Sequence, residues 1–217
     1  MKIILEGTSS SGKSSIVKLF PKKYKKVALD DLEYNKEQLY KNVKNKYYKN
    51  EEMDKMFYNI ISNRLSSRVK GSSDFIIDQV DPKNLSKLIN KLPNTTVRIL
   101  LYTNLNDLVD NIDKRKIYDA RGLFVFKQFT QYYVKTDDNG IDIININDFI
   151  EYLKKIKFFF ENEKELVKFA KDIFKDLGIT DKKNHNIKPR ISTYNYLLNS
   201  KGKTPTELKN IILNLSK

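Results

Sequence analysis

Short apolar runs alternate along the chain with longer stretches whose apolar residues recur about every three to four positions. The apolar runs predict strands over residues 2–6, 27–29, 75–77 and 97–102. The longer periods predict helices over residues 13–20, 51–70, 82–92 and 105–116. Strands that alternate with long helices indicate a parallel sheet covered by helices on both faces. We therefore expect a three-layer α/β fold.

Two segments compete for the fifth and last strand of this sheet. Ile141 to Ile144 has the apolar character of a strand, but Tyr194 to Asn199 stands directly before a strongly marked helix. Thr204 and Glu207 form the pattern of a capping box, and Pro205 occupies the first helical position. The closing strand is therefore predicted at 194–199. Residues from about 118 to 192 then form a mostly helical insertion before it, within a single domain of 217 residues.

The loop between the first strand and the first helix reads GTSSSGKS, residues 7–14. This is the complete P-loop pattern in the strand–loop–helix context that it requires. Gly7 and Gly12 allow the backbone to wrap a phosphate, Lys13 reaches the β- and γ-phosphates, and the Ser14 hydroxyl binds Mg²⁺. The predicted nucleotide-binding residues are Gly7, Thr8, Ser9, Ser10, Ser11, Gly12, Lys13, Ser14 and Ser15. ATP with Mg²⁺ is the expected cofactor pair, although the motif itself does not distinguish ATP from GTP.

The amino-acid composition limits the kinds of metal site and binding partner that we expect. The chain has no cysteine, which excludes disulfides and thiolate metal sites. Its single histidine, His185, leaves little scope for a histidine-based metal site. It has no apolar stretch of about 20 residues and no signal peptide, so we expect a cytoplasmic protein without a membrane anchor. The net charge of +14 favours anionic partners. Because the lysines are spread among many Asn and Ile residues, a nucleic-acid partner is kept as an alternative and is not favoured. The oligomeric state is not predicted.

Other features of the sequence select among P-loop proteins. Guanine-specific GTPases need an Asn-Lys-x-Asp signature, and the nearest segment, residues 103–107, lacks the lysine. A kinase instead needs carboxylates near the transferred phosphoryl group. Asp30 and Asp78 each follow a predicted strand, and the carboxyl ends of parallel strands are where ligands bind. Asp30 is predicted to be a catalytic base that also contacts the acceptor. Asp78 is predicted to bind Mg²⁺ together with Ser14 and to face the substrate.

The segments IILEGTSSSGKSSI, VALDDL, FIIDQV, ARGL and YNYLLNSKGKTPTELKNII resemble the chloramphenicol phosphotransferase-like group of P-loop kinases. The resemblance covers roughly half of the chain. It implies that Asp30 activates the acceptor hydroxyl and that Asp78 is the aspartate after the third strand. It also implies lid arginines, for which the corresponding basic residues here are Lys114, Arg115, Lys116, Arg121 and Arg190. Such small kinases normally lack the long segment between Arg121 and Arg190.

The first hypothesis is an ATP-dependent kinase that phosphorylates a hydroxyl of a small molecule. Its predicted catalytic residues are Lys13, Asp30, Arg115 and Arg121. Its predicted substrate-binding residues are Asp30, Asp78, Arg64, Arg68 and Arg190; Arg64 and Arg68 lie one helical turn apart and are able to grip an acceptor phosphate. A polynucleotide or nucleotide kinase is the second hypothesis. The third is a nucleotide-regulated binding protein without a small-molecule acceptor.

Overall fold

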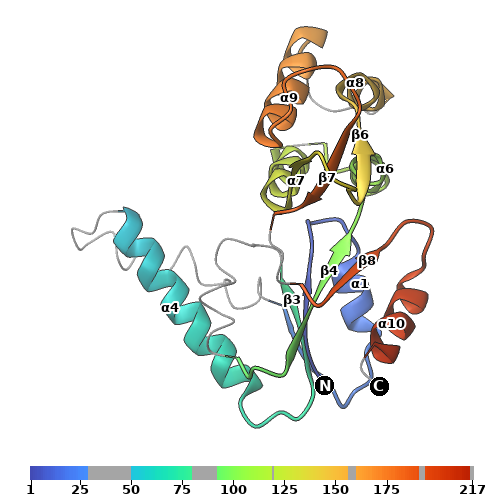
Figure 1. Cartoon of the computed structure of the whole chain (residues 1–217). Coiled ribbons are helices and arrows are strands. Elements are labelled where there is room, and N and C mark those ends of the chain that lie inside the picture. The colour runs from blue at the N-terminus through green and yellow to red at the C-terminus, as the bar shows by residue number, and fades with distance from the viewer. Residues whose placement is uncertain (29–49, 80–91, 119, 156–159, 191–193, 216–217) are drawn as a thin grey trace. The chain divides into compact units, whose positions relative to one another are not determined.

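The computed structural model describes residues 1–28, 50–79, 92–118, 120–155, 160–190 and 194–215 (Figure 1). It contains a five-stranded parallel sheet in the order β2-β3-β1-β4-β8. The five strands are β1 (Lys2–Glu6), β2 (Lys25–Ala28), β3 (Phe75–Gln79), β4 (Thr96–Tyr102) and β8 (Tyr196–Asn199). This sheet, with its P-loop and helices, confirms the predicted three-layer fold and the placement of the closing strand.

The chain divides into two compact units. The first unit comprises residues 1–6, 13–99 and 204–217, and the second comprises residues 7–12 and 100–203. The P-loop is thus shared, since its first six residues belong to the second unit and Lys13 and Ser14 belong to the first. Whether the whole chain acts as one domain stays a prediction.

In the first unit, the inner strands β1 and β3 are apolar on both faces. They pair in parallel with Ile4 opposite Ile77, and β2 pairs with the other side of β3. Ile4 and Ile77 pack with Leu65 of helix α4 (Asn50–Val69) in one buried cluster. Burying both faces requires nearly continuous apolar strands, and the sequence of β1 and β3 supplies them.

The opposite face of these strands is covered by α1 (Lys13–Lys18) and α10 (Pro205–Asn214), which contact each other (Figure 1). Side chains alternate along a strand, so Asp78 points away from the α4 side where Ile77 lies. Its hydrogen bond with Ser14 of α1 places α1 on this second face. The capping box predicted for α10 is present, with Thr204 accepting from the Glu207 amide and Glu207 accepting from the Thr204 amide.

Two helices end earlier than the sequence predicts, for local reasons. α1 ends at Lys18, where the next two amides donate to carbonyls three residues back and tighten the last turn. Helix α6 (Leu105–Lys114) ends because Lys116 adopts a φ of +54°, which a helix cannot contain. The helix predicted from Pro82 lies mostly outside the described residues. None of the described helices is long and apolar enough to cross a membrane.

The second unit contains α6 and the elements of the predicted insertion. Its helices are α7 (Ala120–Tyr132), α8 (Ile146–Lys155) and α9 (Glu163–Asp176), in agreement with a largely helical segment. It also contains a three-stranded antiparallel sheet that the sequence analysis did not predict. The strands are β5 (Tyr133–Thr136), β7 (His185–Pro189) and β6 (Asp142–Ile144), in that order across the sheet. The strand-like segment ending at Ile144 therefore pairs with β7 and does not close the large sheet.

Aromatic side chains form the core of the second unit. Phe126 and Phe129 of α7, Tyr133 of β5 and Phe149 of α8 are essentially inaccessible to water. Phe126 meets Phe149 edge-to-face, and Phe129 lies against Tyr133 with ring centres 4.5 Å apart. Burial raises the pKa of the Tyr133 phenol, so it stays neutral. Each buried ring contributes roughly 1.5–3 kcal/mol, which is why α7 and α8 are held firmly within this unit.

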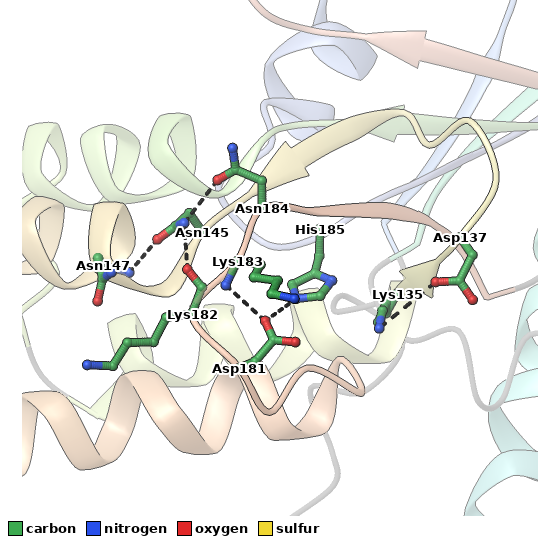
Figure 2. Close-up of polar contacts among 9 residues, drawn as sticks. All are labelled: Lys135, Asp137, Asn145, Asn147, Asp181, Lys182, Lys183, Asn184 and His185. Atoms are coloured by element: carbon green, nitrogen blue, oxygen red, sulfur yellow. Dashed lines mark hydrogen bonds and ion pairs between the residues drawn. The ribbon is translucent and has the colours of Figure 1, made fainter.

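A network of polar contacts fixes the turn from α9 to β7, residues 181–185, against the start of α8 (Figure 2). Asn145 donates from its amide to the carbonyl of Lys182 and to the side chain of Asn184, at 3.0 and 2.9 Å. Its own side-chain oxygen accepts from the Asn147 amide and caps α8. Within the turn, Asp181 accepts from Lys183 and pairs with His185 at 2.6 Å. These bonds, chiefly the one from His185, hold the pKa of Asp181 below its usual value.

Replacing Asn145 with alanine removes the cap of α8 and both donations to the turn. We expect the free energy of unfolding, measured by urea denaturation, to fall by about 1–2 kcal/mol. Asn147→Ala is the matched control, because Asn147 is exposed in the same first turn, and it should cost less than about 0.5 kcal/mol. Equal losses for the two variants would show that the bonds of Asn145 do not hold the turn.

Candidate active site

The P-loop needs glycine at its two ends for different reasons. Gly7 has a φ of +146°, and a Cβ at this position would lie 2.6 Å from the carbonyl oxygen of Leu101. Gly12 has a φ of +95°, and no described atom lies within 4 Å of the place where its Cβ would be. Gly7 is therefore required by close packing at the end of β4. Gly12 is required by its backbone angle and leaves open space beside the loop, where a phosphate can approach.

Side chains from α6 and α7 hold the loop segment 7–12 within the second unit. The Ser9 amide donates to Oε1 of Gln128 at 3.0 Å, and Asn111 donates to the Ser10 carbonyl at 3.0 Å. Arg115 reaches the Ser10 hydroxyl at 3.4 Å, at the long end of a hydrogen bond. Arg115 was among the residues predicted from the sequence, whereas Gln128 and Asn111 were not. The sequence around Gln128 gives little signal, because Lys127, Thr130 and Gln131 beside it are also polar.

In the first unit, the structure brings together Ser14 and Asp78, the two predicted metal ligands. Ser14 Oγ donates to Asp78 Oδ2 at 2.5 Å. Asp78 is only 6% exposed, and its other carboxylate oxygen, Oδ1, is buried without a hydrogen-bond partner among the described residues. Lys13, next to Ser14, is buried at the start of α1, and Ser15 is exposed on the same helix. A buried carboxylate with one oxygen unused is costly unless a ligand completes it.

The donor atoms of this pair fit Mg²⁺. Magnesium prefers oxygen ligands and is usually held by one or two protein groups, with phosphates and water filling the remaining positions. The Ser14 hydroxyl and the Asp78 carboxylate are already in contact, and the second carboxylate oxygen has no partner among the described residues. The pair therefore matches that pattern. The part of the chain that the structure describes has no cluster of three or more His, Cys, Asp or Glu side chains suited to a metal ion. A cation held by protein ligands alone is therefore not indicated there.

The remaining predicted site residues are dispersed. Asp30 lies outside the described residues. Arg64 and Arg68 lie one turn apart on α4, the first half-buried and the second exposed. Arg121 falls in the first turn of α7.

Arg190, predicted to bind substrate, is engaged with the protein itself. Its guanidinium donates to the carbonyls of Thr130 and Asp176 at 2.8 and 2.5 Å, and its backbone amide donates to Tyr132. These bonds join the end of α7 to the end of α9 through β7. In this structure Arg190 has a structural role in the second unit.

Comparisons with known proteins give a limited result. No family model matches the chain, and no curated protein matches it. Among solved structures, a gluconokinase from Sinorhizobium meliloti 1021 is similar with 16% identity and a TM-score of 0.42, covering 81% of this chain and 92% of its own. A shikimate kinase from Aquifex aeolicus has 14% identity and a TM-score of 0.42 over 100% of this chain and 96% of its own. A shikimate kinase from Acinetobacter baumannii, in complex with shikimate, has 13% identity and a TM-score of 0.45 over 99% and 92%.

These likenesses are to P-loop kinases, and they do not bear on the acceptor of this chain. The resemblance to the chloramphenicol phosphotransferase group is not confirmed by them.

Gly7→Ala tests the close approach at the end of β4. We expect it to lower the free energy of unfolding by at least about 2 kcal/mol, because the added methyl group has to displace the backbone at Leu101. Gly71→Ala is the matched control, since Gly71 also has a positive φ, +74°, but has open space around it. It should cost only about 1 kcal/mol from backbone strain. Similar losses in urea denaturation would contradict the packing argument.

Ser14→Ala and Asp78→Asn test the magnesium ligands. Each variant should weaken binding of a non-hydrolysable ATP analogue by about tenfold or more when Mg²⁺ is present, because one oxygen ligand or its charge is lost. Calorimetry in excess EDTA provides the control, where the analogue should bind both variants as well as it binds the unaltered protein. Equal losses with and without Mg²⁺ would show that these residues do not act through the metal.

Proposed function

We propose that this protein is an ATP- and Mg²⁺-dependent kinase that transfers the γ-phosphoryl group to a hydroxyl of a small molecule. The observation that carries the proposal is the contact between Ser14, at the end of a complete P-loop, and the buried Asp78, whose second oxygen has no partner among the described residues. A P-loop alone binds nucleotide. A carboxylate beside its magnesium-binding hydroxyl supplies the second protein ligand that ordered phosphoryl transfer uses.

The proposed roles follow from the charge that moves during transfer. The acceptor oxygen forms a bond to the γ-phosphorus, the bond from that phosphorus to the bridging oxygen breaks, and ADP leaves. Asp30 takes the proton of the hydroxyl, and Lys13 stabilises the phosphate charge. Ser14 and Asp78 would hold Mg²⁺, which neutralises charge on the phosphates. We propose that two arginines neutralise charge on the transferred phosphoryl group. They are Arg115, which contacts the Ser10 hydroxyl of the P-loop, and Arg121 of α7.

The remaining basic residues and the insertion are proposed to contribute to acceptor binding. Arg64 and Arg68 would bind an anionic group of the acceptor, and Arg190 would stabilise the insertion. We propose that residues 118–192 are the lid of a single kinase domain, elaborated with its own small sheet. An alcohol related to those used by the chloramphenicol phosphotransferase-like group is the acceptor class to test first.

One structural observation supports nucleic acid as a second acceptor class. Four lysines of α9, Lys164, Lys168, Lys171 and Lys175, are exposed and recur at helical spacing. Acidic residues on the same helix, among them Asp172 and Asp176, reduce the net positive field. A polynucleotide kinase is therefore the weaker candidate.

Substrate-dependent ADP release from Mg-ATP, measured with a library of hydroxyl compounds, tests the proposal. We expect one class of alcohol to raise the rate, and Asp30→Asn to lower that acceptor-dependent rate by about 10²- to 10⁴-fold while nucleotide binding persists. Lys13→Ala is the control that should remove turnover altogether.

Other outcomes select between the alternatives. Phosphorylation of oligonucleotide 5′-hydroxyls that weakens steeply with added salt would establish the polynucleotide kinase instead. Tight nucleotide binding with no acceptor-dependent rate would leave a nucleotide-regulated binding protein. Full turnover in Asp30→Asn would remove Asp30 as the base.

A further inference from the structure

Gln128 is a buried amide on helix α7. It lies on α7 near Phe126 and Phe129, both fully buried, and is itself only 7% exposed. Burial of an amide is unfavourable unless it is hydrogen-bonded. Its Oε1 accepts from the Ser9 amide at 3.0 Å, a bond between residues 119 positions apart. The side chain is therefore placed to hold the P-loop.

The bond acts where the loop is conformationally unfavourable. Ser10 has a φ of +65°, a left-handed conformation that residues other than glycine seldom adopt. The backbone on either side of this residue is held from outside the loop, at the Ser9 amide by Gln128 and at the Ser10 carbonyl by Asn111. Without such bonds, Ser10 would relax and the loop amides would lose their arrangement around a phosphate.

The same bond shows which side of α7 faces the loop. Positions 121 and 128 are seven residues apart, close to two helical turns, so they lie on the same side of the helix backbone. The side of α7 that meets Ser9 is therefore also the side that carries position 121.

From these three observations we infer that Gln128 is a positioning residue for the donor site, coupling the P-loop to α7, the helix that carries Arg121. The inference rests on the proposed function, because it takes the loop to be the nucleotide site. Gln128 itself contacts the loop backbone and acts through Ser9. Nucleotide binding and the order of α7 are thereby linked, and each stabilises the other.

Gln128→Met tests the role, since methionine has similar volume and no comparable acceptor. In the nucleotide-free protein, hydrogen–deuterium exchange of the peptide containing Ser9 should accelerate by about tenfold. The dissociation constant of Mg-ADP should rise by about three- to tenfold, as expected for one lost hydrogen bond in the site. Gln131→Met, the same change three residues later on α7, is the matched control and should alter neither quantity. Equal behaviour of the two variants would overturn the inference.

Gln128→Glu separates the hydrogen bond from general packing. A carboxylate still accepts from the Ser9 amide, so loop exchange should stay slow, while its negative charge near the phosphates should weaken Mg-ADP binding. Exchange as fast as in Gln128→Met would show that an acceptor at this position is not what holds the loop.

The two arms also distinguish this inference from the proposed function. If the unaltered protein failed to bind Mg-ADP, the proposed function would fail, while the exchange measurement would still report on the loop contact. If it bound Mg-ADP and Gln128→Met matched Gln131→Met, the inference alone would fail.

Discussion

The polar backbone of the P-loop is buried, and every group on it therefore needs a partner. Thr8, Ser10 and Ser11 are each less than a tenth exposed, and the loop turns back so closely that Gly7 touches the end of β4. Each buried amide or carbonyl without a hydrogen bond would lower the stability of the folded loop, and the loop cannot pair all of these groups within itself. Side chains from the surrounding helices supply some of these hydrogen-bond partners. The turn bond from Ser11 to Thr8 and the contacts of Gln128 and Asn111 with the loop backbone meet this need.

The residue before the loop presents an electrostatic problem. Glu6 ends β1 and is fully buried directly beside the segment that is proposed to bind phosphate. An isolated carboxylate there would repel a nucleotide and would be poorly solvated. Arg98 of β4 meets both of its oxygens, at 2.8 and 3.2 Å, so the pair is neutral and geometrically fixed. The cost of burying these two charges is offset by their mutual attraction and their two hydrogen bonds.

The second unit supplies the loop's support from a hydrophobic core of its own. Phe126 and Phe149 pack α7 against α8, and Arg190 joins α7 to α9 through backbone carbonyls. The helix that carries Gln128 is thus held by packing as well as by its contact with the loop. A helix of the predicted insertion therefore contacts the P-loop from a unit with its own core.

The sequence by itself determined the features that local chemistry controls. The glycines of the P-loop, the capping box at Thr204 and the closing strand before it are all specified within a few neighbouring residues, and the structure contains each of them. The contact between Ser14 and Asp78 was also predictable, because parallel strands end at one edge. Only the tertiary structure decided the rest. Gln128 and Asn111 lie more than a hundred positions from the loop that they hold, and β6 pairs with β7 across a stretch that contains both α8 and α9. No local pattern encodes such distant pairings, since they depend on how the whole chain packs.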